Sequence, residues 1–150
     1  MFWTISLINL KKIFLSSDHA GYKLKESIKL YLDKKNFLYT DLGPFNGDRV
    51  DYPDYAHKVA KKVKTSSNHV GILICGSGIG MNIAANRHKN IRAAQCFNLK
   101  STKLSRLHND ANIITLGSRL LAKKNALNCV SIFLNTKFEG GRHAKRIKKI

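Results

Sequence analysis

Residues 70–82 read VGILICGSGIGMN, a continuous apolar run followed directly by a glycine-rich turn. The run VGILIC (70–75) is typical of a strand buried on both faces of a parallel sheet. The turn CGSGIG (75–80) has a glycine at every second position, and the helical pattern MNIAANRH (81–88) follows it. A strand, a tight turn and a helix in this order predict a βα unit and therefore an α/β fold.

The rest of the chain repeats this alternation of apolar runs and helical patterns. Strands are predicted at 12–17, 37–43, 70–75, 91–97 and 112–117. Helices are predicted at 20–35, 52–64, 81–88, 99–108, 122–138 and 141–150. Strands that alternate with helices form right-handed βαβ units. We therefore expect a Rossmann-like, three-layer α/β/α sandwich around a five-stranded parallel sheet.

The length of 150 residues fits one domain that is large enough to bury a core. We expect residues 1–11 to be an N-terminal extension of uncertain structure, and residues 12–150 to form a single α/β domain with a C-terminal helical arm. The apolar stretch at residues 1–10 is too short to span a membrane. Positive charge follows it, whereas a secretory signal carries positive charge in front.

The net charge is +18, from 27 Lys and Arg against 9 Asp and Glu. The basic residues are scattered over several predicted helix faces, and only GRHAKRIKKI (141–150) is locally dense in charge. A dispersed basic surface attracts any polyanion weakly, through counterion release. We expect neither a specific nucleic-acid partner nor a membrane partner.

The three cysteines, Cys75, Cys96 and Cys129, are widely spaced and form no CxxC pair. This pattern favours neither a disulfide framework nor a zinc site, and no metal is expected. A reducing, cytoplasmic compartment fits it best. Cys96 and Cys129 have apolar neighbours without glycine and are expected in the core.

Four polar or glycine-rich segments each follow a predicted strand. They are SDHAG (17–21), GDRVDYPDY (47–55), CGSGIG (75–80) and GSR (117–119). In open α/β sheets, ligands bind at the carboxyl ends of the strands. These segments are therefore expected to share one edge of the sheet and to form the functional site.

The glycine turn does not fit the known nucleotide motifs. The dinucleotide fingerprint follows the first strand and has an acidic residue about 20 positions later, but residues 91–100 contain neither Asp nor Glu. A P-loop lysine–serine pair is also missing from the turn. Bare backbone N–H groups beside a helix start hold an anion instead, either a phosphate or an oxyanion formed during a reaction. At that position Cys75 is a candidate base or nucleophile, or else a buried structural cysteine.

Six ordered segments carry a family resemblance. They are SSDHAGYKLK (16–25), DYPDYA (51–56), GILICGSGIGMNIAANR (71–87), IRAA (91–94), SRLHNDANIITLGSR (105–119) and FEGGRHAKRI (138–147). This set resembles the family of type B ribose-5-phosphate isomerases, which also holds the galactose-6-phosphate isomerase subunits. The resemblance runs from Lys12 to Ile147 and leaves only residues 1–11 outside it.

The resemblance implies an aldose–ketose isomerase. The expected reaction interconverts ribose-5-phosphate and ribulose-5-phosphate, in the non-oxidative branch of the pentose phosphate pathway, by ring opening and an enediolate, without a metal or another cofactor. One alternative is a relative that acts on a six-carbon sugar phosphate, such as galactose-6-phosphate or allose-6-phosphate. A second alternative is a non-catalytic protein that binds anions or nucleic acid.

The resemblance also implies roles for individual residues. Cys75 matches the base that abstracts a proton; some relatives use instead a Glu after the last loop glycine, where this chain has Met81, which cannot take a proton. Ser77 matches a hydroxyl that assists proton movement, and His108 matches the acid–base group that opens the furanose ring. Substrate contacts are implied for Asp18, His19, Tyr52 and Asn109, and for the backbone N–H groups of Gly76, Gly78 and Gly80.

Three arginines are the implied phosphate ligands, because a guanidinium group binds phosphate in a bidentate manner. Arg119 ends the last predicted strand segment, whereas Arg142 and Arg146 are four residues apart and so share one helix face. The latter two follow the last long helix and not a strand. The resemblance implies a homodimer, or a tetramer, in which they serve the partner's site, and in which His108 and Asn109 are shared likewise.

Overall fold

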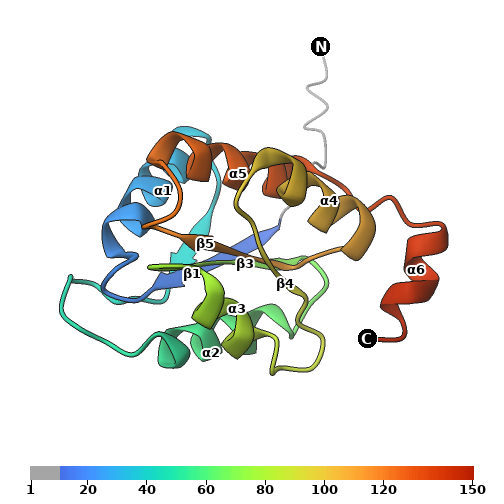
Figure 1. The fold of residues 1–150 in the computed structure, drawn as a ribbon, viewed down its shortest axis with the longest axis horizontal. Helices are drawn as coiled ribbons and strands as arrows, with labels where there is room; N and C mark the ends of the chain where they lie inside the picture. The colour runs from blue at the N-terminus through green and yellow to red at the C-terminus, as the bar shows by residue number, and fades with distance from the viewer. Residues whose placement is uncertain (1–10) are drawn as a thin grey trace, which may run out of the picture.

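The computed structural model describes residues 11–150, which form a five-stranded, all-parallel sheet between two layers of helices (Figure 1). The strands are β1 (Lys12–Ser17), β2 (Tyr39–Asp41), β3 (His69–Cys75), β4 (Ala93–Gln95) and β5 (Ile113–Gly117), in the spatial order β2-β1-β3-β5-β4. The helices are α1 (Tyr22–Lys34), α2 (Tyr52–Val63), α3 (Ile79–Ala85), α4 (Leu99–Asn109), α5 (Lys123–Asn135) and α6 (Arg142–Ile147). The predicted α/β/α sandwich is confirmed. The predicted extension, apart from its last residue, lies outside the described residues.

The layers follow the order of the elements. Helices α1, α4 and α5 cover one face of the sheet, α2 and α3 cover the other, and α6 stands beside the sandwich next to α4 (Figure 1). No helix among residues 11–150 is long and apolar enough to cross a membrane.

The central strand β3 separates two buried clusters. Ile72 and Ile74 belong to the cluster with α1 and α5, whereas Leu73 and Cys75 belong to the cluster with α2 and α3. This alternation is the two-residue period of a strand, with both faces covered. Cys96 and Cys129 are buried in the first cluster, as predicted.

The two edge strands are shorter than their sequence patterns indicated. β2 covers three residues of the predicted 37–43, and β4 covers three of the predicted 91–97. Both pair on one side only, β2 with β1 and β4 with β5. An edge strand therefore has fewer ladder hydrogen bonds to hold its ends than a central strand has.

A buried ion pair fixes the turn after β2. Lys25 Nζ, on α1, donates to both carboxylate oxygens of Asp41 at 2.7 Å and to the carbonyl of Pro44 at 2.7 Å. Lys29 also contacts Asp41, at 2.9 Å. Hydrogen bonds to a carboxylate compensate for its removal from water. This cluster thus anchors the start of the loop that leads to α2.

Candidate active site

A cavity of about 290 Å³ opens at the carboxyl ends of the strands. Residues from all four segments that were expected at this edge line it or border it. Its lining residues are Asp18, Tyr52, Cys75, Gly76, Ser77, Gly80, Arg119 and Leu120. Six of the predicted substrate or catalytic residues, together with Arg119, therefore meet in one protomer, and Leu120 is a lining residue that the sequence did not single out.

The thiol of Cys75 is held by its own turn. The Gly78 N–H donates to Cys75 Sγ at 3.1 Å. Gly78 has a φ of 77°, and a side chain there would come within 2.9 Å of the Leu116 backbone, so only glycine fits. This hydrogen bond fixes the position of the sulfur at the wall of the cavity.

Ser77 is fixed on both sides. Its Oγ accepts a hydrogen bond from the Ile79 N–H at 3.2 Å, and its carbonyl accepts one from Gln95 Nε2, on β4, at 3.0 Å. Gly117, at the end of β5, lies so close that a Cβ there would be 2.5 Å from the Ser77 carbonyl oxygen. The loop is therefore clamped between two strands, and the hydroxyl is presented at the cavity wall.

Tyr52, the first residue of α2, packs against Gly80 in the first turn of α3. A Cβ at Gly80 would lie 2.6 Å from the Tyr52 ring. The ring is partly exposed and lines the cavity. The glycine thus makes room for an aromatic wall, which suits packing against a sugar.

Asp18 and His19 follow β1 and have different partners. The Asp18 carboxylate is buried and accepts a hydrogen bond from the Gly21 N–H at 2.9 Å. Gly21 approaches the end of β3 so closely that a Cβ would be 2.5 Å from the Ile74 carbonyl oxygen, which brings the Asp18 turn next to Cys75. His19 Nδ1 lies 3.2 Å from the Val50 carbonyl oxygen and so links the β1 turn to the loop before α2.

Arg119 forms another part of the cavity wall, beside Gly76. Its backbone N–H donates to the Gly76 carbonyl at 2.9 Å. Its guanidinium lies against Gly76, where a Cβ would be 3.0 Å from Nη1. The cavity therefore combines one fixed positive charge with a thiol, a hydroxyl and a carboxylate.

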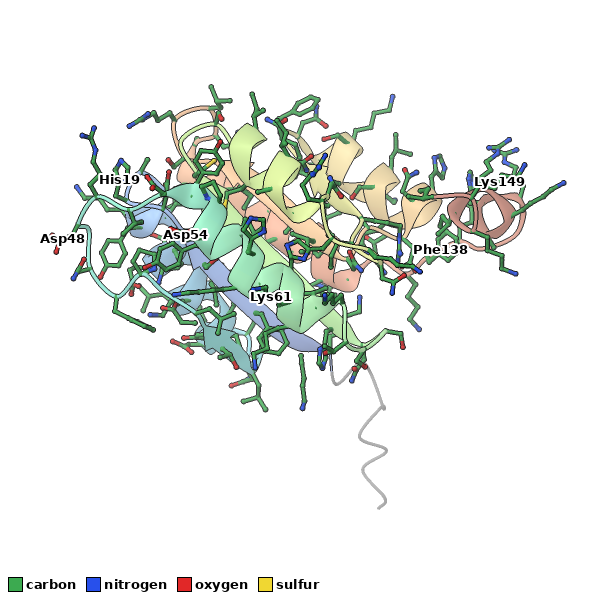
Figure 2. The ribbon with its side chains drawn as sticks, turned by 90° about the horizontal axis from the view of Figure 1, so that it is seen from below. His19, Asp48, Asp54, Lys61, Phe138 and Lys149 are labelled. Atoms are coloured by element: carbon green, nitrogen blue, oxygen red, sulfur yellow. The ribbon has the colours of Figure 1, made fainter. Side chains whose placement is uncertain are left out.

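The other four predicted site residues lie elsewhere in the protomer. His108 and Asn109 end α4, and Arg142 and Arg146 lie on α6. Figure 2 shows His19 at one end of the molecule and Phe138 and Lys149, which flank α6, at the other. A single protomer therefore separates these four residues from Cys75. Asn109 borders a second cavity, of about 240 Å³, beside Arg92.

His108 has partners that the sequence did not indicate. Its ring stacks on His143 with centroids 4.2 Å apart and planes inclined by 14°, and its Nε2 lies 3.9 Å from Glu139 Oε2. Both partners come from the short segment 139–143: Glu139 lies between α5 and α6, and His143 lies on α6. No local spacing links this segment to the end of α4, so only the packing of α6 on α4 reveals the cluster.

The chain is similar to known proteins over nearly all of its length. A family model described as Ribose/Galactose Isomerase matches residues 13–150. A "Putative sugar phosphate isomerase" of Rickettsia bellii is 48% identical over 138 residues, which cover 92% of this chain and 96% of that protein. The "Ribose-5-phosphate isomerase B" of Escherichia coli is 41% identical over 141 residues, which cover 94% of this chain and 95% of that one.

Solved structures give the same picture. A ribose-5-phosphate isomerase B from Mycoplasma genitalium, solved with bound ribulose-5-phosphate, superposes with a TM-score of 0.91 at 44% identity and covers 94% of both chains. One from Anaplasma phagocytophilum gives a TM-score of 0.90 at 48% identity, covering 95% of this chain and 97% of that one.

Proposed function

Since the chain belongs to the ribose/galactose isomerase family, we propose that it interconverts ribose-5-phosphate and ribulose-5-phosphate. The observation that carries this proposal is the cavity in which the Cys75 thiol accepts a hydrogen bond from its own glycine turn. A relative with the same fold holds ribulose-5-phosphate. No contact among residues 11–150 favours a six-carbon sugar phosphate or a nucleic acid over this substrate.

Cys75 is the base that moves the proton between carbons. The thiolate takes the proton from C2 of the open-chain aldose, the C–H electron pair forms the C1=C2 bond, and the carbonyl electrons move onto O1. The O2 proton then passes to O1, and Sγ returns its proton to C1, which leaves the ketone at C2. One group acting on both carbons conserves every atom, as an isomerisation requires.

Ser77 and the loop backbone act on the oxygens. The Ser77 hydroxyl relays the proton between O2 and O1. Backbone N–H groups at Gly76 and Gly80 stabilise the enediolate charge. The Gly78 N–H already donates to Cys75 Sγ, so we assign it to the thiolate and not, as the sequence suggested, to the enediolate.

Tyr52, Asp18 and Arg119 bind the substrate. The Tyr52 ring packs beside the sugar, and the Asp18 carboxylate accepts hydrogen bonds from its hydroxyls. Arg119, at the cavity wall, contributes positive charge toward the phosphate. His19 holds the loop before α2 in place through its contact with Val50.

The remaining four residues act from a partner subunit. In one protomer, the end of α4 leads into the amino end of β5 and α6 packs beside α4, whereas the cavity lies at the carboxyl ends of the strands. Ring opening and phosphate binding both need these residues close to the sugar. A homodimer, alone or within a tetramer, solves this if each α4–α6 end meets the other's cavity. His108 then opens the furanose, Asn109 binds a sugar oxygen, and Arg142 and Arg146 clamp the phosphate. We place the enzyme in the cytoplasm, because its three free cysteines fit a reducing compartment, and we assign it no cofactor.

The direct test is an isomerase assay on the full chain. Ribose-5-phosphate should be converted to ribulose-5-phosphate at a much higher kcat/KM than allose-6-phosphate or galactose-6-phosphate is converted to its ketose. The rate should persist after exhaustive chelation, because every proposed proton transfer uses a side chain of the protein, with the backbone N–H groups stabilising the charge. A preference for a six-carbon substrate, or a rate that chelation abolishes and added metal restores, would refute this assignment.

A further inference from the structure

We propose that Gln95 positions the catalytic thiol through the peptide group that joins Ser77 to Gly78. Gln95 is the last residue of β4, and its Nε2 donates to the Ser77 carbonyl at 3.0 Å. The N–H of the same peptide group, on Gly78, donates to Cys75 Sγ at 3.1 Å. The effect on turnover rests on the proposed function, whereas the effect on the peptide group does not.

The two hydrogen bonds are coupled because a peptide group is planar. Its C=O and N–H point in opposite directions in the trans form, and neither can turn without the other. A side chain that fixes the Ser77 carbonyl therefore also fixes the Gly78 N–H toward the sulfur. Hydrogen bonds in a chain polarise one another, so the amide of Gln95 also strengthens this N–H as a donor.

The backbone of the turn does not determine this orientation by itself. Gly78 has a φ of 77°, and glycine adopts negative φ about as readily as positive φ. Rotation of the peptide group would direct the Ser77 carbonyl oxygen, instead of the N–H, toward Cys75 Sγ. An oxygen there would repel the negative charge that the sulfur carries when it acts as the base. A hydrogen bond from outside the turn can therefore decide between the two orientations.

Gln95 supplies that hydrogen bond. No backbone N–H among residues 11–150 donates to the Ser77 oxygen, so the side-chain amide is its partner. Gly117 leaves room for this oxygen, because a Cβ there would lie 2.5 Å away. The amide is held by the sheet, since Gln95 pairs with Thr115 in the register of β4 and β5. The donor to the thiol thus depends on an edge strand that contributes no residue to the cavity lining.

The first test removes the donor and keeps the size of the side chain. Gln95→Met has a similar length but no N–H. We expect kcat to fall about 3–10-fold, the equivalent of about one hydrogen bond. KM should be nearly unchanged, because Gln95 does not line the cavity. A loss that appears equally in kcat and kcat/KM marks an interaction made in the transition state.

The second test restores the donor by acidification. In Gln95→Glu, the ionised carboxylate has no proton to donate to the Ser77 oxygen, whereas the protonated carboxyl donates again. The ratio of the variant's kcat to the wild-type kcat should therefore rise as the pH is lowered from about 8 to about 5, toward the range in which glutamate is protonated. The same ratio for Gln95→Met should stay level. A loss of packing alone would give no such recovery.

A third measurement needs no isomerase activity. The exchange rate of the Gly78 amide hydrogen, followed by NMR on the full chain, reports whether its hydrogen bond is kept, and Gln95→Met should accelerate this exchange. Asn86→Ala is the matched control, because the Asn86 side chain binds both the N–H and the carbonyl of Ala93 on the same strand. Its remaining side-chain hydrogen bond goes to Asn82, outside the glycine turn. This variant should loosen β4 without changing the Gly78 exchange rate or kcat.

The outcomes are distinct. An unchanged Gly78 exchange rate in Gln95→Met, or an equal acceleration in Asn86→Ala, overturns the positioning by Gln95. Faster exchange in Gln95→Met with an unchanged kcat overturns the effect on catalysis, as does a ratio for Gln95→Glu that stays level on acidification. A wild-type chain that does not isomerise ribose-5-phosphate overturns the proposed function, while the exchange rates still decide whether Gln95 holds the peptide group.

Discussion

Mixing two inactive variants should restore activity if the site is shared between subunits. One variant is Cys75→Ala, which removes the base from the cavity. The other is the double variant Arg142→Ala/Arg146→Ala, which removes the phosphate clamp from α6. Cys75 and α6 belong to the two separate ends of one protomer. Each variant homodimer should therefore have both of its sites damaged.

The expected recovery follows from the geometry. In a mixed dimer, the Cys75→Ala cavity meets the damaged α6, so both lesions fall in one site and the other site is wild type. Random exchange of equal amounts makes about half of the dimers mixed, each with one working site of two, so the mixture should reach about a quarter of wild-type activity in a closed twofold dimer. Neither parent alone should approach this value.

The assay follows ribulose-5-phosphate formation after reversible dissociation and reassembly, with differently tagged chains to measure exchange. A matched control mixes Cys75→Ala with Arg119→Ala. Both residues line the same cavity of one protomer, so every mixed dimer carries one lesion in each site and should stay inactive. Complete exchange without recovery in the first mixture would show that all these residues serve their own subunit.

Three further predictions test single elements. Cys75→Ala should lower kcat by about 10²–10⁴-fold, the usual contribution of a general base, with an unchanged melting curve; near-wild-type turnover would exclude this thiol as the base. His108→Asn should slow the cyclic substrate far more than an open-chain analogue, and equal losses on both would assign it another role. Although burial favours a higher value, hydrogen bonds from Lys25 and Lys29 lower the net pKa of Asp41. A carboxyl with a lowered pKa in the folded state stabilises the fold at pH values above its unfolded-state pKa. This stabilisation is lost as the carboxylate is protonated, so the free energy of unfolding should fall below about pH 4. Asp41→Asn should flatten that fall in acid denaturation, and an unchanged slope would contradict it.

The sequence predicted those features that depend on local pattern. β3 and the glycine turn were visible as an apolar run that ends in CGSGIG, and the alternation of strands and helices predicted the parallel sheet. The same reasoning placed Asp18, Tyr52 and Arg119 at one sheet edge, because chain order and strand direction determine it.

The features that the sequence missed depend on contacts between distant segments. The stacking of His108 on His143 and the nearby Glu139 arise only because α6 packs against α4. The hydrogen bond from Gly78 to Cys75 depends on a left-handed backbone angle that glycine permits but does not dictate. The ends of the edge strands likewise depend on which neighbours they pair with, and apolar pattern alone extends them too far.

The separation of the two halves of the site has a consequence for how the enzyme responds to its own abundance. In the proposed dimer, a free protomer has the Cys75 cavity but no partner arginines to bind the phosphate in it. It therefore has no complete active site and no activity. When the protein is dilute enough to dissociate, the dimer population varies with the square of the total concentration. Doubling a scarce enzyme then raises flux about fourfold, by mass action. Synthesis of the chain thereby becomes a steeper control on sugar-phosphate flux than it is for an enzyme whose single chain is complete.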